Sequence, residues 1–99
     1  MNLDRAILVL RELRRRLEAR GIAHAAIFGS VGRNDARAAS DIDIVVTPVE
    51  GRRLDLIDFG GVQTLLDEGF SGLSVDVVVE PVKQPTLRAA IQRDRVDVF

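Results

Sequence analysis

Two aspartates, Asp41 and Asp43, stand at the start of an aliphatic run. In an extended strand their carboxylates project from one face, while Ile42 and Ile44 face the other. Carboxylates held about 7 Å apart repel each other unless a positive charge lies between them. Mg²⁺ prefers such oxygen ligands together with substrate phosphates, so the pair predicts a metal site. Asp41 could instead be an ordinary turn residue or, with Ser40, a helix cap.

A third acid, Asp76, interrupts a valine-rich run over residues 74–80. Ionised carboxylates seldom lie among valines without a partner, although Asp76 could face solvent on a half-exposed strand. Gly29-Ser30 ends another apolar run, where a short helix could begin and offer backbone N–H groups and a hydroxyl to nucleotide phosphates. Three carboxylates on one sheet face beside such a turn predict a two-metal site for phosphoryl transfer.

The segment Gly29-Ser30-Val31-Gly32-Arg33, followed by Ser40-Asp41-Ile42-Asp43, resembles a known signature. The signature is G-S-x-x-R…S-D-x-D of the DNA polymerase beta nucleotidyltransferase superfamily. The short chain, with Asp76 among valines, resembles the minimal nucleotidyltransferase branch of that superfamily. The likeness spans nearly the whole chain, from the first helix to the last.

The resemblance implies a Mg²⁺-dependent enzyme that moves a nucleotide, AMP from ATP, onto a hydroxyl group. The site would hold two Mg²⁺ ions, and Asp41 and Asp43 would bind both of them. Asp76 would ligate the catalytic ion and help deprotonate the attacking hydroxyl. Pyrophosphate would leave as the hydroxyl attacks in line.

The resemblance also assigns the nucleotide-binding residues. Gly29 and Ser30 would hold the β- and γ-phosphates, and Arg33 would position the nucleotide or the signature turn. Arginine suits the recognition of phosphate or carboxylate groups. The alternative role of Arg33 is a salt bridge that holds Asp35 or Asp41.

The chain departs from the family pattern in two places. Many relatives have Arg-Ala-Arg-Gly after Gly-Ser, where this chain has Val31-Gly32-Arg33-Asn34. The missing basic residue and the shifted glycine could change the turn or weaken triphosphate binding. Relatives often end in a helix that contains Glu and Tyr, and residues 92–99 of this chain differ from that helix. The difference puts in doubt any contact that the family makes through this last segment. The three acids are present, so a competent enzyme is expected.

The elements that must position these residues follow from apolar spacing. An amphipathic helix is predicted over residues 3–19, capped by Asn2 and ended by Gly21. Strands are predicted over 23–28, 41–46 and 74–80, and further helices over 54–68 and 86–94. With a short helix after Gly29, the order is α-β-α-β-α-β-α, with Val96 and Val98 as a packed tail. This is an α/β fold in which helices pack on a small mixed sheet, one domain over residues 1–99 in two layers or slightly more.

Composition excludes several other functions. Lys and Arg total 14 against 15 for Asp and Glu, so no global basic field favours nucleic acid. Without Cys, disulfides, thiolate zinc sites and cysteine nucleophiles are excluded. The single histidine, His24, argues against a Ser-His-Asp triad and is expected to pack within its strand. No membrane span or signal peptide is evident, so a cytoplasmic protein is expected.

The chain has no room for an acceptor-binding domain, so the acceptor is expected on a partner. The resemblance implies the antitoxin of a HEPN toxin–antitoxin pair, which transfers AMP from ATP to a tyrosine of the HEPN ribonuclease toxin in a hetero-oligomer. The alternatives are an antitoxin that acts by binding alone and a nucleotidyltransferase for a small molecule such as an antibiotic. Arginines of the first helix could meet an acidic partner surface or form a solvated face: Arg11, Arg14, Arg15 and Arg16.

Overall fold

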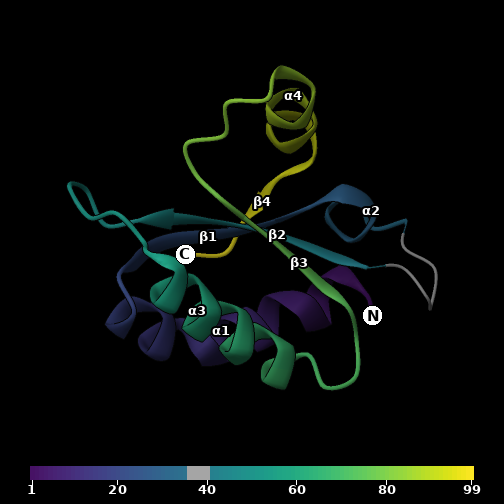
Figure 1. The fold of residues 1–99 in the computed structure, drawn as a ribbon. Helices are drawn as coiled ribbons and strands as arrows, with labels where there is room; N and C mark the ends of the chain where they lie inside the picture. The colour runs from purple at the N-terminus through teal and green to yellow at the C-terminus, as the bar shows by residue number, and fades with distance from the viewer. Residues whose placement is uncertain (36–40) are drawn as a thin grey trace.

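Four strands form a mixed sheet in the order β3-β2-β1-β4 in the computed structural model, which describes residues 1–35 and 41–99 (Figure 1). The strands are β1 (Ile22–Phe28), β2 (Ile42–Pro48), β3 (Val75–Val79) and β4 (Val96–Asp97). Strand β1 runs antiparallel to β2 and β4, whereas β2 and β3 are parallel. The parallel pair requires a crossover, and the helix between the two strands provides it.

Helices cover both faces of the sheet. They are α1 (Leu3–Ala19), α2 (Gly29–Gly32), α3 (Leu56–Gly69) and α4 (Pro85–Asp94). Helices α1 and α3 lie together on one face and α4 lies on the other (Figure 1). The predicted α/β fold is confirmed, with three layers where the helices overlap the sheet. In the described residues no helix is long and apolar enough to cross a membrane.

Helices α1, α3 and α4 each begin at a residue whose side chain caps the helix. Asn2 accepts a hydrogen bond of 2.9 Å from the Arg5 amide, as the sequence predicts for α1. Helix α3 begins with a capping box between Asp55 and Asp58. The Gln84 side chain accepts from the Leu87 amide at the start of α4.

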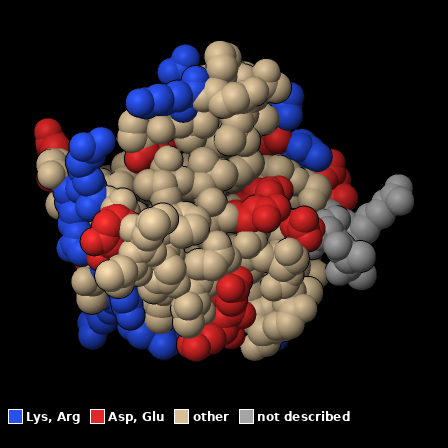
Figure 2. All heavy atoms as spheres, in the orientation of Figure 1, with Lys and Arg blue, Asp and Glu red and all other residues tan. Residues whose placement is uncertain are grey.

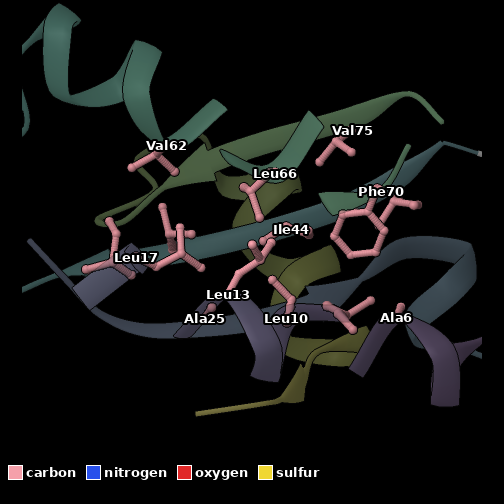
Figure 3. Close-up of a cluster of buried hydrophobic side chains, with 14 of the residues drawn as sticks. Ala6, Leu10, Leu13, Leu17, Ala25, Ile44, Val62, Leu66, Phe70 and Val75 are labelled. Carbon is pink, nitrogen blue, oxygen red and sulfur yellow. The ribbon is translucent and has the colours of Figure 1, made fainter. Parts of the chain in front are cut away.

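The main core lies between the sheet and helices α1 and α3 (Figure 3). The predicted inward face of β2 is confirmed, because Ile42, Ile44 and Val46 are completely buried. A smaller cluster lies between the other face and α4: Ala26, Phe28, Val45 and Ile91. Burial of each large aliphatic side chain contributes about 1.5–3 kcal/mol, so both clusters hold the strands in register.

Two features differ from the sequence predictions. Val96, expected in a tail, belongs to β4 and pairs with Ile27 at the edge of β1. A two-residue strand is too short to produce a periodic signal. His24 is exposed rather than packed. It pairs with Thr47 near the end of β2, whereas α4 packs further along β1, against Ala26.

Candidate active site

The pairing of β2 with β3 places Asp43 directly opposite Asp76. Neighbouring strands lie about 4.8 Å apart and paired side chains share a face, so the two carboxylates project side by side. Their face is the one that α4 covers, because Val45 and Val78, two residues further along, pack in the α4 cluster. Asp41 is exposed and directly precedes β2. The structure therefore brings the three predicted acids to one end of this sheet face.

Asp43 lies in a strongly negative environment. Its side chain is half-buried, and burial raises the pKa of its carboxyl above the ordinary value. The negative charges of Asp76 and Asp41 raise this pKa further, while Arg33 lowers it. Figure 2 shows acidic side chains gathered over the ends of β2 and β3 nearest α2. Such crowding of like charges is typical of a site that binds a cation.

Gly29 brings the turn after β1 against these acids. Phe28, the last residue of β1, is paired with Asp43, so the chain turns at Gly29 beside that carboxylate. Gly29 has φ +66°, and a Cβ there would collide with the Asp43 carboxylate. Ser30 follows in the four-residue helix α2. The first amides of a helical turn have no partner within the helix, so the turn can offer N–H groups and the Ser30 hydroxyl to a phosphate.

The residues that depart from the family pattern have structural explanations. Val31 is 1% exposed and packs in the main core, so its side chain does not face the acids. A Cβ on Gly32 would lie 2.7 Å from the backbone carbonyl oxygen of Asp94, which explains a glycine at that position. Asn34 has φ 59°, the left-handed conformation that asparagine tolerates best after glycine.

Arg33 forms two ion pairs. Its Nε donates to Asp35 at 3.2 Å, which confirms the alternative role that the sequence left open. Its Nη1 donates at 2.8 Å to Asp94, the last residue of α4. Sequence reasoning missed Asp94; the available signal was an acid at the end of the predicted helix.

The donor set at the site suits Mg²⁺, a hard ion that binds carboxylate oxygens. The raised pKa of Asp43 is the second indication, because a bound cation would favour the ionised carboxylate that burial and the neighbouring acids disfavour. Within residues 1–35 and 41–99, however, no three acidic or histidine side chains are already arranged to hold an ion. The fit to Mg²⁺ therefore rests on donor chemistry and strand register.

Comparison with known families agrees with this fold. A model described as a nucleotidyltransferase domain matches residues 9–98. The chain belongs to the nucleotidyltransferase domain family and is a nucleotidyltransferase.

One named relative and two solved structures are similar to this chain. A Methanocaldococcus jannaschii protein, provisionally named a protein adenylyltransferase, is 38% identical over 79 residues, which cover 80% of this chain and 82% of the relative. A solved structure described as a minimal nucleotidyltransferase is 30% identical, with a TM-score of 0.77 over 97% of this chain and 95% of that one. A complex of a tri-AMPylated Shewanella oneidensis HEPN toxin with its MNT antitoxin contains a chain that is 21% identical, with a TM-score of 0.64 over 93% of this chain and 70% of that one. This last likeness shows the fold alone.

Proposed function

We propose that this chain transfers AMP from ATP to a tyrosine hydroxyl of a HEPN-type ribonuclease toxin and so acts as its antitoxin. The observation that carries the proposal is the Asp43–Asp76 pair, with Asp41 adjacent, beside the turn at Gly29. The AMPylated toxin in the Shewanella complex and the name of the M. jannaschii relative support the choice of AMP and of a protein acceptor.

The acids supply the chemistry of the transfer. Two Mg²⁺ ions, when bound, would stabilise the charge that develops on the α-phosphate and the leaving pyrophosphate. Asp41 and Asp43 would hold both ions, and Asp76 would hold one of them. Asp76 would also take the proton of the acceptor hydroxyl as its oxygen bonds to the α-phosphorus. The bond between the α-phosphorus and the bridging oxygen breaks, and pyrophosphate carries away that electron pair.

The turn supplies nucleotide binding. Backbone N–H groups at Gly29 and Ser30, with the Ser30 hydroxyl, would hold the β- and γ-phosphates. Arg33 adds a positive charge next to them. Its ion pairs with Asp35 and Asp94 fix the guanidinium at the end of α2, which favours a positioning role for this residue.

The partner surface is argued from charge. Exposed arginines line the outer side of α1: Arg11, Arg14, Arg15 and Arg16. Arg14 is engaged within the chain, because it pairs with Glu18 at 3.4 Å and lies 5.2 Å from the centre of the Phe99 ring. The other three arginines would bind an acidic surface of the toxin in a hetero-oligomer.

A transfer assay tests the proposal. The purified chain is incubated with its co-encoded partner, radiolabelled ATP and Mg²⁺, and the Asp41→Asn/Asp43→Asn variant is run alongside. We expect label on the partner with the wild type and none with the variant. The matched control is Asp67→Asn/Glu68→Gln, which removes two exposed negative charges from α3 and should leave labelling unchanged.

The other outcomes identify the alternatives. Absence of label, with a variant that still binds and neutralises the partner, would show an antitoxin that acts by contact alone. Label on an added aminoglycoside but not on the partner would show a small-molecule nucleotidyltransferase. Mass spectrometry of the labelled partner locates the acceptor, and AMP on a residue other than tyrosine would overturn that part of the proposal.

A further inference from the structure

We propose that Asp94 is a positioning residue for the nucleotide-binding turn: its buried carboxylate holds Arg33 and ties the turn to the end of α4. The inference rests on the proposed function, in which Arg33 and the turn bind the triphosphate. Asp94 does not itself contact the nucleotide in this proposal and acts through Arg33.

The Asp94 carboxylate is the meeting point of two arginines. Its Oδ2 accepts from Arg33 Nη1 at 2.8 Å, and its Oδ1 accepts from Arg93 Nε at 2.9 Å. Its side chain is only 3% exposed, whereas that of Arg33 is 43% exposed. A carboxylate so buried is stable only when it is paired and hydrogen-bonded. The hydrogen bonds from Arg93 and then Arg33 hold the pKa of Asp94 below its ordinary value, although burial opposes them.

The backbone makes a second connection between α4 and the turn. The carbonyl oxygen of Asp94 lies where a Cβ on Gly32 would approach to 2.7 Å, so the two segments are in close contact. Helix α4 ends at Asp94 because Arg95 adopts an extended backbone, and the Arg95 amide still donates to the Ile91 carbonyl at 2.8 Å. Ile91 packs in the small cluster with Phe28, the residue directly before the turn. Helix α4 therefore fixes both the start and the end of α2.

This connection matters because Arg33 is paired with Asp35 and Asp94 and also acts on the acid cluster that contains Asp43. Its charge lowers the pKa of Asp43, so the guanidinium acts on the acid cluster. Without Asp94, Arg33 would keep Asp35 as an anchor, but that residue is exposed and lies on the same turn. The guanidinium could then shift toward Asp43 and compete with a metal ion for it. Asp94 keeps the charge where it can meet a phosphate.

The test is a double-mutant cycle on nucleotide affinity. Wild type, Asp94→Asn, Arg33→Gln and the double variant are titrated calorimetrically with a non-hydrolysable ATP analogue and Mg²⁺. The temperature is one at which circular dichroism shows every variant folded. We expect Asp94→Asn and Arg33→Gln each to weaken binding about tenfold, the scale of one charged hydrogen bond. The double variant should bind no more weakly than Arg33→Gln, because Asp94 acts through Arg33.

Two variants separate positioning from general stability. Arg93→Gln removes the other arginine on Asp94 and should leave affinity unchanged, even if the melting temperature falls. Asp94→Glu keeps the charge and should restore most of the affinity. Asp94→Glu also provides the test if Asp94→Asn does not fold. An Asp94→Glu variant that folds like the wild type but binds the analogue as weakly as Arg33→Gln does would then overturn the proposal.

The remaining outcomes are distinct. Unchanged affinity in Asp94→Asn, with a loss in Arg33→Gln, would overturn the positioning role and leave the proposed function standing. Additive losses in the double variant would show that Asp94 acts independently of Arg33, which also overturns it. A wild type that does not bind the analogue would overturn the proposed function, and this inference with it.

Discussion

The sheet face under α4 carries one polar pair at each end of the parallel strands β2 and β3, the second formed with Glu80, which directly follows β3. Asp43 faces Asp76 at one end, and Thr47 meets Glu80 at the other. At the second end the Glu80 carboxylate has two partners. The Thr47 hydroxyl donates to Glu80 at 2.7 Å, and Arg95 approaches the same carboxylate oxygen at 3.6 Å. At the first end two carboxylates stand together, and the pKa of Asp43 is raised by burial and by its acidic neighbours.

The contrast separates a polar pair that stabilises the fold from the pair to which the proposed function assigns the chemistry. Both pairs lie on one face, between β2 and either β3 or the residue that directly follows it, so strand geometry alone does not distinguish them. A hydroxyl and an arginine around one carboxylate stabilise the native state without a ligand. Neighbouring acids destabilise it until a cation binds. In the proposed function, the end that is less stable on its own is the one that binds the metal ions and the nucleotide.

The largest effect is expected from Asp43→Asn compared with Glu80→Gln. Asp43→Asn should reduce AMP transfer at least about a hundredfold, because a lost metal ligand removes several kcal/mol of transition-state stabilisation. Glu80→Gln should leave transfer within about twofold of the wild type, because within the described part of the chain the side-chain contacts of Glu80 are with Thr47 and Arg95 and not with the acids. Initial rates at saturating ATP measure both. Equal losses in the two variants would remove the distinction between the two ends.

Gly29→Ala should produce the next largest effect, with Gly51→Ala as its matched control. Both glycines have positive φ, +66° and +81°, so alanine at either should destabilise the fold by about 1–2 kcal/mol. At Gly51 a Cβ would meet nothing within 4 Å, whereas at Gly29 it would collide with the Asp43 carboxylate. Gly29→Ala should therefore also reduce transfer about tenfold or more.

Urea denaturation and transfer rates check this pair of variants. Similar losses of stability with activity lost only in Gly29→Ala would support the expected contact. Full activity in Gly29→Ala would show that Asp43 can move aside without consequence.

Magnesium should stabilise the wild type and not Asp43→Asn. At ten times the dissociation constant, binding adds about 1.4 kcal/mol, which is about 7 °C in melting temperature for a domain of this size. The effect should fade as the pH falls, because protons compete with the ion for Asp43. Thermal melts with and without Mg²⁺ at several pH values measure it.

The same series tests the pKa of Asp43 without metal. Its folded-state pKa is raised, so the stability from this group is complete below its unfolded pKa and is lost as the pH rises through the folded value. Asp43→Asn resembles the protonated form and should be more stable than the metal-free wild type at pH 7. The difference should shrink toward acid pH. A variant less stable than the wild type at pH 7 would contradict the proposed repulsion.

The sequence predicted this site only as far as local patterns reach. Alternation along single strands is a local property, and it correctly placed Ile42 and Ile44 in the core and Asp43 on the opposite face. The Arg33–Asp35 pair was also foreseen, because its members are two residues apart. The Arg33–Asp94 pair joins residues 61 positions apart, and no local pattern encodes such a contact.

The same limit explains the missed β4 and the exposed His24. Strand β4 exists because the end of α4 directs the chain back along β1, where Asp97 pairs with Ala26. His24 is exposed because α4 packs further along β1, and its coverage depends on the register of distant elements. The spacing of apolar residues predicts whether a segment is a helix or a strand. Which strands pair, and which residues a helix covers, depend on how the layers assemble.

The smallest effect is expected from Thr47→Val, which removes one hydrogen bond at the Glu80 end while keeping the shape of the side chain. The loss should be about 0.5–1 kcal/mol in unfolding free energy, the net value of one hydrogen bond. It should not be larger, because the Glu80 side chain is 30% exposed and keeps Arg95, so water can replace the hydroxyl. Urea denaturation measures the loss, with Thr64→Val on the exposed side of α3 as control. The rate of AMP transfer should stay unchanged. A lower rate would mean that the pair at Glu80 affects the acid cluster through β2 and β3, which would contradict the separation of a structural end from a functional end.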